Sequence, residues 1–321
     1  MRIFVTGATG VIGVRVVREL VERGERVTAV GRSEEKRAML RGLGAEAVEV
    51  DLFDRPAVQR AVAGHDAIVN LATAVPRSAV RMFLPGAWRE MDRVRRQLSA
   101  SLVHAALAGD TVGRLVQESF APIYADGGDG WIDEGSPVRP SRYNRSVLDA
   151  EAAARRFTDA GRTAVVLRFG AFYGPDDAVT RQLVDSVRRG WAPFLGRPGG
   201  YLSSVAHDDA ASAVVAALGV PAGIYNVVET EPLRRRELAD SIARLIGTPP
   251  PRFIPAWTRH LAGSVGEMLA RSLRVSNRRL REAGGWSPRH PTLLDGLRDI
   301  LQAAPDTAAP RRVRASRPIR P

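Results

Sequence analysis

Three glycines at intervals of three residues, Gly7, Gly10 and Gly13, stand between a strand-like run and a helical pattern in the segment VTGATGVIG. In such a turn the first glycine allows the tight bend and the second lets the backbone approach a pyrophosphate. The third lets the helix pack closely on the strand. The helix N-terminus then offers free N–H groups and a partial positive charge to phosphates. The turn predicts a dinucleotide-binding site, with contacts from Gly7, Thr9, Gly10, Val11, Ile12 and Gly13.

Short apolar segments alternate with helical patterns through the first half of the chain. This alternation predicts an α/β fold, a Rossmann-like doubly wound parallel sheet with helices on both faces. Strands are expected at Arg2–Thr6, Arg26–Val30, Ala45–Val50, Ala67–Leu71, Arg114–Glu118 and Ala164–Arg168. Helices are expected at Val11–Arg23, Glu34–Gly42, Pro56–Ala63, Gly86–Ala108 and Tyr143–Ala160.

The alternation loosens after Gly174, which indicates a second, smaller unit. We expect residues 1–175 and 202–231 to form the nucleotide-binding Rossmann domain. Residues 176–201 and 232–303 would form a mostly helical C-terminal lobe that binds the substrate. The last segment, residues 304–321, is rich in Pro, Ala and Arg and cannot bury a core, so we expect a disordered basic tail.

The net charge of +12 raises the question of a nucleic-acid partner. The tail alone carries five arginines against Asp306, and the remaining charges are interleaved with acids along helices such as Arg15–Arg23. That pattern is typical of a solvated surface, so we expect neither nucleic-acid nor membrane binding. Because the chain has no cysteine and no run of about 18 apolar residues, we expect a cytoplasmic protein that binds no metal.

Several further motifs follow the glycine turn in a fixed order. They are DLFD at Asp51–Asp54, NLAT at Asn70–Thr73, LRFGAFYGP at Leu167–Pro175 and a closing GGWSP. In this order they resemble the extended short-chain dehydrogenase/reductase family, the NAD(P)-dependent epimerase/dehydratase group. The resemblance reaches to about Leu301. It implies that Asp51 and Leu52 contact the adenine, and that Asn70, Leu71 and Ala72 lie beneath the cofactor ribose.

The end of the second strand, TAVGRSEE, bears on which cofactor is used. In relatives that prefer NAD, the resemblance implies an acid at the position of Gly31, where it binds the ribose 2′-hydroxyl. Gly31 removes that carboxylate, and Arg32 can pair with a 2′-phosphate through its forked guanidinium. We therefore expect NADP. NAD stays open, because Glu34 and Glu35 lie nearby.

The resemblance also implies a catalytic tyrosine and a lysine four residues later on the same helix face. The tyrosine is Tyr143, but Val147 occupies the lysine position, and Lys36 is the only lysine in the chain. Without a cation beside it, a phenol keeps its proton at neutral pH. Tyr143 could then donate a proton but would rarely act as a base, which favours reduction over oxidation.

The hydroxyl residue that the resemblance implies at the end of the fifth strand is displaced. Counting back from Tyr124, the usual position falls on Phe120, so Ser119 could orient a carbonyl only if the strand end bulges. Phe120, Ala121 and Pro122 stand where sugar-nucleotide 4,6-dehydratases carry Thr, Asp and Glu, which argues against such a dehydratase.

Three further residues are candidates for the substrate pocket. Trp88 belongs to an apolar loop, Met82–Trp88, that could cover the substrate, and Arg168 and Tyr173 could line the pocket. The helices expected at Gly86–Ala108 and Tyr143–Ala160 resemble those through which family members pair into four-helix dimers. We therefore expect a homodimer.

Three functions fit these observations. The first is an NAD(P)-dependent reductase or epimerase-like enzyme for a small carbonyl or sugar-like substrate, with Tyr143 as proton donor and Ser119 as carbonyl-orienting hydroxyl. The second is a redox-neutral isomerase, lyase or cyclase on the same fold, suggested by the missing lysine and the displaced serine. The third is a binding protein that senses NADP without turnover. Fold alone does not choose among them.

Overall fold

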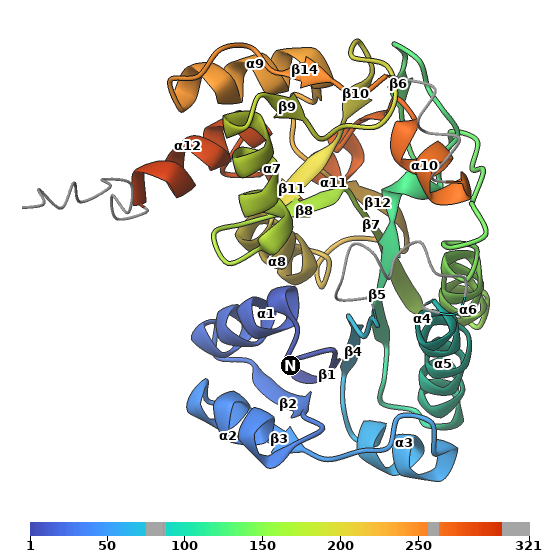
Figure 1. Ribbon diagram of the computed structural model, residues 1–321. Helices are drawn as coiled ribbons and strands as arrows, with labels where there is room; N and C mark the ends of the chain where they lie inside the picture. Colours follow the sequence, from blue (N-terminus) through green and yellow to red (C-terminus); the bar gives the residue numbers. More distant parts are fainter. Residues whose placement is uncertain (75–85, 87, 256–262, 304–321) are drawn as a thin grey trace, which may run out of the picture.

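A seven-stranded parallel sheet organises this computed structural model, which describes residues 1–74, 86, 88–255 and 263–303 (Figure 1). The strand order is β12-β7-β5-β4-β1-β2-β3, and every registered neighbour pair is parallel. The predicted Rossmann-like doubly wound fold is therefore confirmed. The strands are β1 (Arg2–Thr6), β2 (Arg26–Val30), β3 (Glu46–Val48), β4 (Ala67–Asn70), β5 (Arg114–Phe120), β7 (Thr163–Phe169) and β12 (Gly223–Val227).

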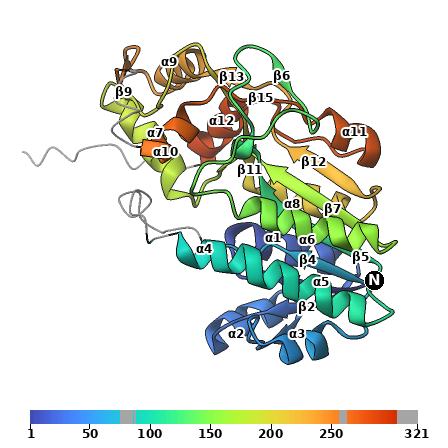
Figure 2. The same cartoon turned by 90° about the vertical axis from the view of Figure 1, so that its right-hand side faces the viewer.

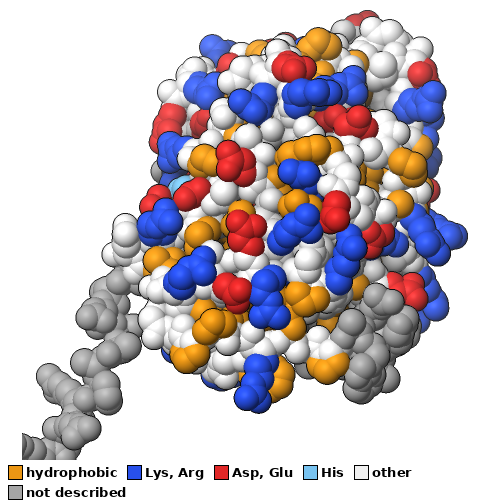
Figure 3. Space-filling view, turned by 90° about the horizontal axis from the view of Figure 1, so that it is seen from above, with side chains coloured by type: hydrophobic (Ala, Val, Ile, Leu, Met, Phe, Trp, Pro, Cys, Tyr) orange, Lys and Arg blue, Asp and Glu red, His pale blue; other side chains and the backbone are white. Residues whose placement is uncertain are grey.

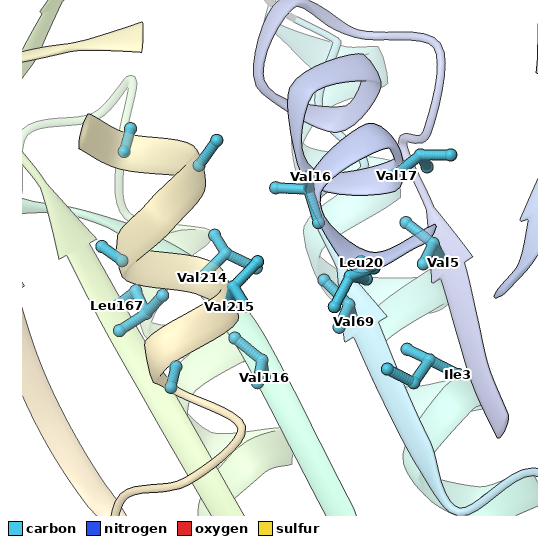
Figure 4. Packing of buried hydrophobic residues seen from close by; sticks show 14 of the residues in the cluster. Ile3, Val5, Val16, Val17, Leu20, Val69, Val116, Leu167, Val214 and Val215 are labelled. Atoms are coloured by element: carbon cyan, nitrogen blue, oxygen red, sulfur yellow. The ribbon is translucent and has the colours of Figure 1, made fainter. Parts of the chain in front are cut away.

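Helices cover both faces of the sheet, as Figures 1 and 2 show. One face carries α1 (Val11–Glu22), α2 (Glu34–Gly42) and α8 (His207–Ala216), and the other carries α3 (Arg55–Val62), α5 (Ser99–Ala108) and α6 (Val147–Asp159). Because a parallel sheet is buried on both faces, its strands read as continuous apolar runs. In Figure 4, Val16, Val17 and Leu20 of α1 and Val214 and Val215 of α8 pack above the strand residues Ile3, Val5, Val69, Val116 and Leu167.

In the C-terminal part of the chain, α7 (Ala178–Arg188), α9 (Arg235–Leu245) and α12 (Leu293–Ala303) pack around a separate apolar cluster containing Leu238, Ile242 and Leu297. Two further helices are α10 (Gly263–Ala270) and α11 (Arg278–Gly284), and Leu280 of α11 packs in the same cluster as α1 and α8. Short paired strands accompany them: β6 (Trp131–Ile132), β8 (Ala171–Tyr173), β9 (Trp191–Ala192), β10 (Tyr201–Leu202), β11 (Ser204–Ala206), β13 (Leu233–Arg234), β14 (Arg252–Phe253) and β15 (Arg274–Val275). The domain boundaries given above stay a prediction, and the tail at 304–321 lies outside the described residues.

The helix expected to begin at Tyr143 begins at Val147 instead, so Tyr143 lies in the turn before α6. Local side-chain hydrogen bonds explain the late start. The Asn144 Oδ1 accepts from both the backbone N–H and the hydroxyl of Ser141, at 2.6 and 3.0 Å. The Ser141 Oγ in turn accepts from the Tyr143 N–H at 3.3 Å. These bonds hold a turn where the periodicity predicts helix.

The long helix expected at Gly86–Ala108 also differs in detail. It consists of α4 (Arg89–Arg93), a π-helical turn at Val94–Leu98 and then α5. The third strand is shorter than expected, whereas β5 and β7 extend by one or two residues. Of the loop Met82–Trp88, only Gly86 and Trp88 lie within the described residues.

The surface carries both signs of charge. On the face shown in Figure 3, Lys and Arg side chains are interspersed with Asp and Glu side chains rather than gathered into one basic area. No helix in the described part of the chain combines the length and the hydropathy that a membrane span requires.

Candidate cofactor and active site

A cavity of about 540 Å³ opens at the carboxyl ends of β1, β2, β3 and β4. The chain leaves β1 toward β2 and β3 and later returns to the other side of β1 as β4, so the sheet order reverses at this point. Ligands of open α/β sheets bind at such a reversal. The lining residues come from each strand end and from the helix after β4: Gly7, Thr9, Gly10, Val30, Arg32, Lys36, Glu49–Phe53, Leu71–Ala74, Glu90, Val94 and Leu98.

The glycine turn is built as its spacing predicts. Gly7 has a φ of +69°, and a Cβ on it would lie 2.4 Å from the carbonyl carbon of Leu71 at the end of β4. A Cβ on Gly13 would lie 2.1 Å from the carbonyl oxygen of Gly7, so only glycine lets α1 pack this closely on the turn. Gly10 lines the cavity, where its bare backbone is open to a ligand. A dinucleotide therefore fits this cradle on steric grounds.

Most residues expected to touch the cofactor line this cavity, and four do not. Val11, Ile12 and Gly13 lie in the first turn of α1, and Asn70 is buried beneath the cavity wall. The Asn70 Oδ1 accepts from the Thr6 hydroxyl at 2.6 Å, and its Nδ2 donates to the Gln117 Oε1 at 2.9 Å. Asn70 thus joins the ends of β1, β4 and β5.

Two basic side chains, one just after β2 and one in the first turn of α2, have no hydrogen bond or ion pair among the described residues. Arg32 and Lys36 line the cavity, and the Ser33 side chain between them caps α2. Arg37, in contrast, donates to the Gly31 carbonyl at 3.2 Å and pairs with Glu34 and Glu49. A Cβ on Gly31 would lie 2.9 Å from the Arg37 Cγ, so glycine is also favoured here by packing.

Phe53 lines the cavity farther along, and Arg93 packs on its ring from outside the set of lining residues. The guanidinium carbon of Arg93 lies 3.8 Å from the centre of the Phe53 ring. The Asp51 carboxylate, which also lines the cavity, accepts from the Phe53 N–H at 2.9 Å and fixes that loop. Lys36, Glu49 and Phe53 also line the cavity and were not predicted from the sequence. The spacing of Arg32 and Lys36, four residues apart at a helix start, was the available signal for one of them.

Tyr143 lies against Trp88, which precedes α4. The ring centres are 5.6 Å apart with an angle of 60° between the planes. Tyr143 is half-buried, and its hydroxyl has no hydrogen-bond partner among the described residues. Its turn is tied to the end of β5 because the Asn144 Nδ2 donates to the Pro122 carbonyl at 3.3 Å. Asn144 thus fixes the turn that carries Tyr143, and it was not predicted from the sequence.

The Ser119 hydroxyl is engaged in a hydrogen bond within the protein. β5 pairs with β7 in unbroken register through Ser119 and Phe120, so the strand end has no bulge. The Ser119 hydroxyl donates to the Glu151 Oε1 of α6 at 2.5 Å. The same carboxylate accepts hydrogen bonds from the Nε and Nη2 of Arg168 at 2.9 and 2.8 Å. Ser119 and Arg168 are therefore joined to each other through the partly buried Glu151 carboxylate.

Arg168 and Tyr173 are both buried, at 4% exposure each. Arg168 lies over the Tyr124 ring at 4.9 Å, and burial raises the pKa of Tyr124 to about 12. Tyr173 packs against Gly296 of α12, where a Cβ would lie 2.3 Å from its hydroxyl oxygen. Burial first, and then the carboxylate of Glu229, raise the pKa of Tyr173. The structure brings neither residue to the cofactor cavity.

Glu229 itself is a buried carboxyl group between β12 and the C-terminal helices. It accepts from the backbone N–H and the hydroxyl of Ser204, both at 2.9 Å. Burial raises the pKa of Glu229 to about 8, against the smaller opposing effect of the Ser204 hydrogen bonds. Within the described ranges, His, Asp and Glu side chains form no cluster suited to a metal ion.

Known proteins are similar to this chain in sequence and in fold. The sequence model described as the NAD dependent epimerase/dehydratase family matches residues 3–227. A Streptomyces protein named 3-diazoavenalumate denitrifying reductase is 35% identical over 309 residues, 92% of this chain and 99% of its own length. The 2-alkyl-3-oxoalkanoate reductase of Stenotrophomonas maltophilia is 28% identical and covers 86% of this chain and 85% of its own.

Solved structures show the same fold. Human epimerase family protein SDR39U1 (isoform 2), determined with NADPH, superposes with a TM-score of 0.79 at 22% identity. That match covers 95% of this chain and all of the human one. DesIV, a dTDP-glucose 4,6-dehydratase from Streptomyces venezuelae determined with NAD, superposes with a TM-score of 0.74 at 24% identity.

Proposed function

This chain belongs to the NAD dependent epimerase/dehydratase family, and from that premise we propose that it is an NADP-dependent reductase of a small carbonyl substrate. The relatives at 35% and 28% identity are both named reductases, and each aligns with most of the chain. The observation that carries the proposal is the glycine-lined cavity at the reversal of the sheet, with two cations just after β2 that have no partner among the described residues.

The choice of NADP over NAD rests on Arg32 and Lys36. Both line the cavity, and neither is engaged by a carboxylate among the described residues. Gly31 brings no acid to the end of β2, and the nearby Glu34 and Glu49 are paired with Arg37. A 2′-phosphate would meet two cations there, one a forked guanidinium and one a compact ammonium. A 2′-hydroxyl would lack the carboxylate that binds it in relatives preferring NAD.

In the proposed reaction the bound cofactor supplies a hydride, and the protein supplies binding, orientation and a proton. Gly7, Thr9 and Gly10 hold the pyrophosphate at the start of α1, where the helix dipole favours anions. Tyr143 donates its phenolic proton to the carbonyl oxygen as negative charge develops there. Trp88, in contact with the Tyr143 ring, restricts the phenol and borders the substrate.

Val147 occupies the lysine position of the family's tyrosine motif and is fully buried at the start of α6. No lysine can take its place, because Lys36 belongs to the other end of the cavity. Ser119 is bonded to Glu151, and Phe120 occupies the usual hydroxyl position. We propose that Tyr143 acts without the family's lysine and hydroxyl beside it, as a proton donor only. The geometry gives no support for substrate contact by Ser119, Arg168 or Tyr173.

Val147 and Phe120, which stand in place of the family's lysine and hydroxyl, also favour a second candidate substrate class. Ketone reduction consumes a hydride and a proton, whereas replacement of a diazonium group consumes a hydride alone. In that replacement a C–H bond forms, the C–N bond breaks, the hydride brings both electrons and N₂ leaves with its bonding pair. One named relative is a denitrifying reductase of a diazo compound. A site with Phe120 and Val147 in place of a hydroxyl and a lysine suits such a substrate.

One experiment separates these possibilities. Purified protein is titrated with NADPH and with NADH, and absorbance near 340 nm is then followed over a panel of aldehydes, ketones, enones and aryl diazonium compounds. Oxidation of NADPH with a carbonyl supports the proposal, and oxidation with release of N₂ supports the second candidate. Product without absorbance change would indicate redox-neutral chemistry. Binding without any product would indicate a sensor. If neither coenzyme binds, the proposal fails.

A further inference from the structure

A buried ion pair lies just beyond the cofactor cavity. The Nε of Arg95 lies 3.1 Å from the Oε1 of Glu118, and the two side chains are 6% and 10% exposed. Charged groups are rarely buried this fully without a specific role or a full set of partners. Among the described residues, the Glu118 carboxylate accepts a hydrogen bond only from the Nε of Arg95. The two terminal nitrogens of the guanidinium have no partner among the described residues.

The sheet order places this pair on the path of a long ligand. The cavity ends at Leu71–Ala74, which follow β4, and the next strand beyond β4 is β5. Gln117 of β5 pairs with Asn70, the last residue of β4, so Glu118 begins the part of β5 that extends past β4. Arg95 and Glu118 do not themselves line the cavity, but a dinucleotide that starts at Arg32 and crosses the glycine turn would extend toward the β5 side, where this pair lies.

The backbone that carries Arg95 has an unusual conformation. Val94–Leu98 is a π-helical turn between α4 and α5, and its first and last residues line the cavity. Such turns are rare and occur frequently at functional sites. The sulfur of Met91, on the helical turn before Arg95, accepts a hydrogen bond from the Ala74 N–H at 3.5 Å. This contact fixes the cavity wall beside the pair.

We propose that Arg95 binds oxygen atoms at the nicotinamide end of the cofactor, with Glu118 as the positioning residue that holds its guanidinium. This inference rests on the proposed function, because it requires that the cavity takes a nicotinamide dinucleotide. It assigns to Arg95 a cationic contact at the end of the site where Val147 leaves none. The forked guanidinium can donate from its two remaining nitrogens while its Nε stays on Glu118.

The test compares two ligands that differ at one end. NADPH carries the nicotinamide ribose, and adenosine 2′,5′-bisphosphate lacks it, so calorimetry with both reports on each end of the cavity. The variant Arg95→Met/Glu118→Leu replaces the pair by apolar residues, which buried ion pairs often tolerate. The control is Arg96→Met on the same turn, because Arg96 pairs with Asp149 at 2.7 Å on an exposed surface. If wild type prefers NADH, the ligands are NADH and AMP.

We expect the double variant to bind NADPH about tenfold more weakly or worse, the loss typical of a hydrogen bond to a charged group. Its affinity for adenosine 2′,5′-bisphosphate should stay within about twofold, and Arg96→Met should change neither affinity. Unchanged NADPH affinity, or equal losses for both ligands, overturns the inference. Wild type that binds neither ligand overturns the proposed function instead. If the double variant does not fold, Arg95→Lys is compared in the same way, because it keeps the charge and loses the fork.

Discussion

The Ser119 hydroxyl donates a hydrogen bond to the Glu151 carboxylate at 2.5 Å, and the same carboxylate holds Arg168 through two further bonds. A hydroxyl engaged in this way cannot at the same time donate to a substrate carbonyl. Ser119 therefore differs from Tyr143, whose hydroxyl has no hydrogen-bond partner in the described ranges. The two residues should respond differently to substitution.

Ser119→Ala should lower stability and leave turnover nearly unchanged. The variant removes one hydrogen bond to a charged group, worth about 1.5–3 kcal/mol, while Arg168 still neutralises Glu151. Chemical denaturation measures the first effect and steady-state kcat the second. A fall in kcat of more than about tenfold with unaltered stability would restore the carbonyl-orienting role of Ser119.

Tyr143→Phe should lower kcat for carbonyl substrates by at least about tenfold, because the proton donor is lost. The phenyl ring keeps its contact with Trp88, so NADPH affinity and the melting temperature should stay the same. Turnover that survives within about threefold, well under 1 kcal/mol of barrier, would show that Tyr143 is not the donor. With a diazonium substrate the same variant should stay active, since no proton is consumed.

Arg32→Ala and Lys36→Ala should each weaken NADPH binding by about tenfold and barely change NADH binding, because each removes a cation that faces the 2′-phosphate. Arg41→Ala is the control, since Arg41 pairs with Glu34 on α2 and does not line the cavity. Calorimetry with both coenzymes measures the effect. Equal losses for NADPH and NADH would contradict the assignment of the phosphate site.

Glu229 should make the protein less stable as pH rises. Its pKa is about 8 in the folded protein and 4.5 as an ordinary carboxyl, so between these values the folded state holds a proton that the unfolded chain has lost. The free energy of unfolding then falls by about 1.4 kcal/mol for each pH unit across that window. Glu229→Gln removes the charge; its Oε1 can accept from the Ser204 N–H and its Nε2 can donate to the Ser204 hydroxyl, so it should flatten this dependence in denaturation curves from pH 5.5 to 9. If the free energy of unfolding fell equally with pH in wild type and variant, another group would be responsible.

The features that local rules govern were predictable from sequence. Spacing and residue type predict the glycine turn, the strand–helix alternation and the place of Arg32 beside the cavity. The structure shows all three features. The contacts of Ser119 with Glu151 were not predictable, because they join β5 and α6 across many residues. The turn at Tyr143 was missed for another reason: Ser141 and Asn144 hydrogen-bond to each other and compete with the helix that the periodicity indicates.

Lys36 carries the only side-chain amine of the chain, and it lines the cofactor cavity. An acylating reagent directed at lysine therefore has a single side-chain target, placed where a ligand would shield it. Mass spectrometry of the modified protein would report the filling of the cavity directly, for any ligand, with no substrate known and no chromophore introduced.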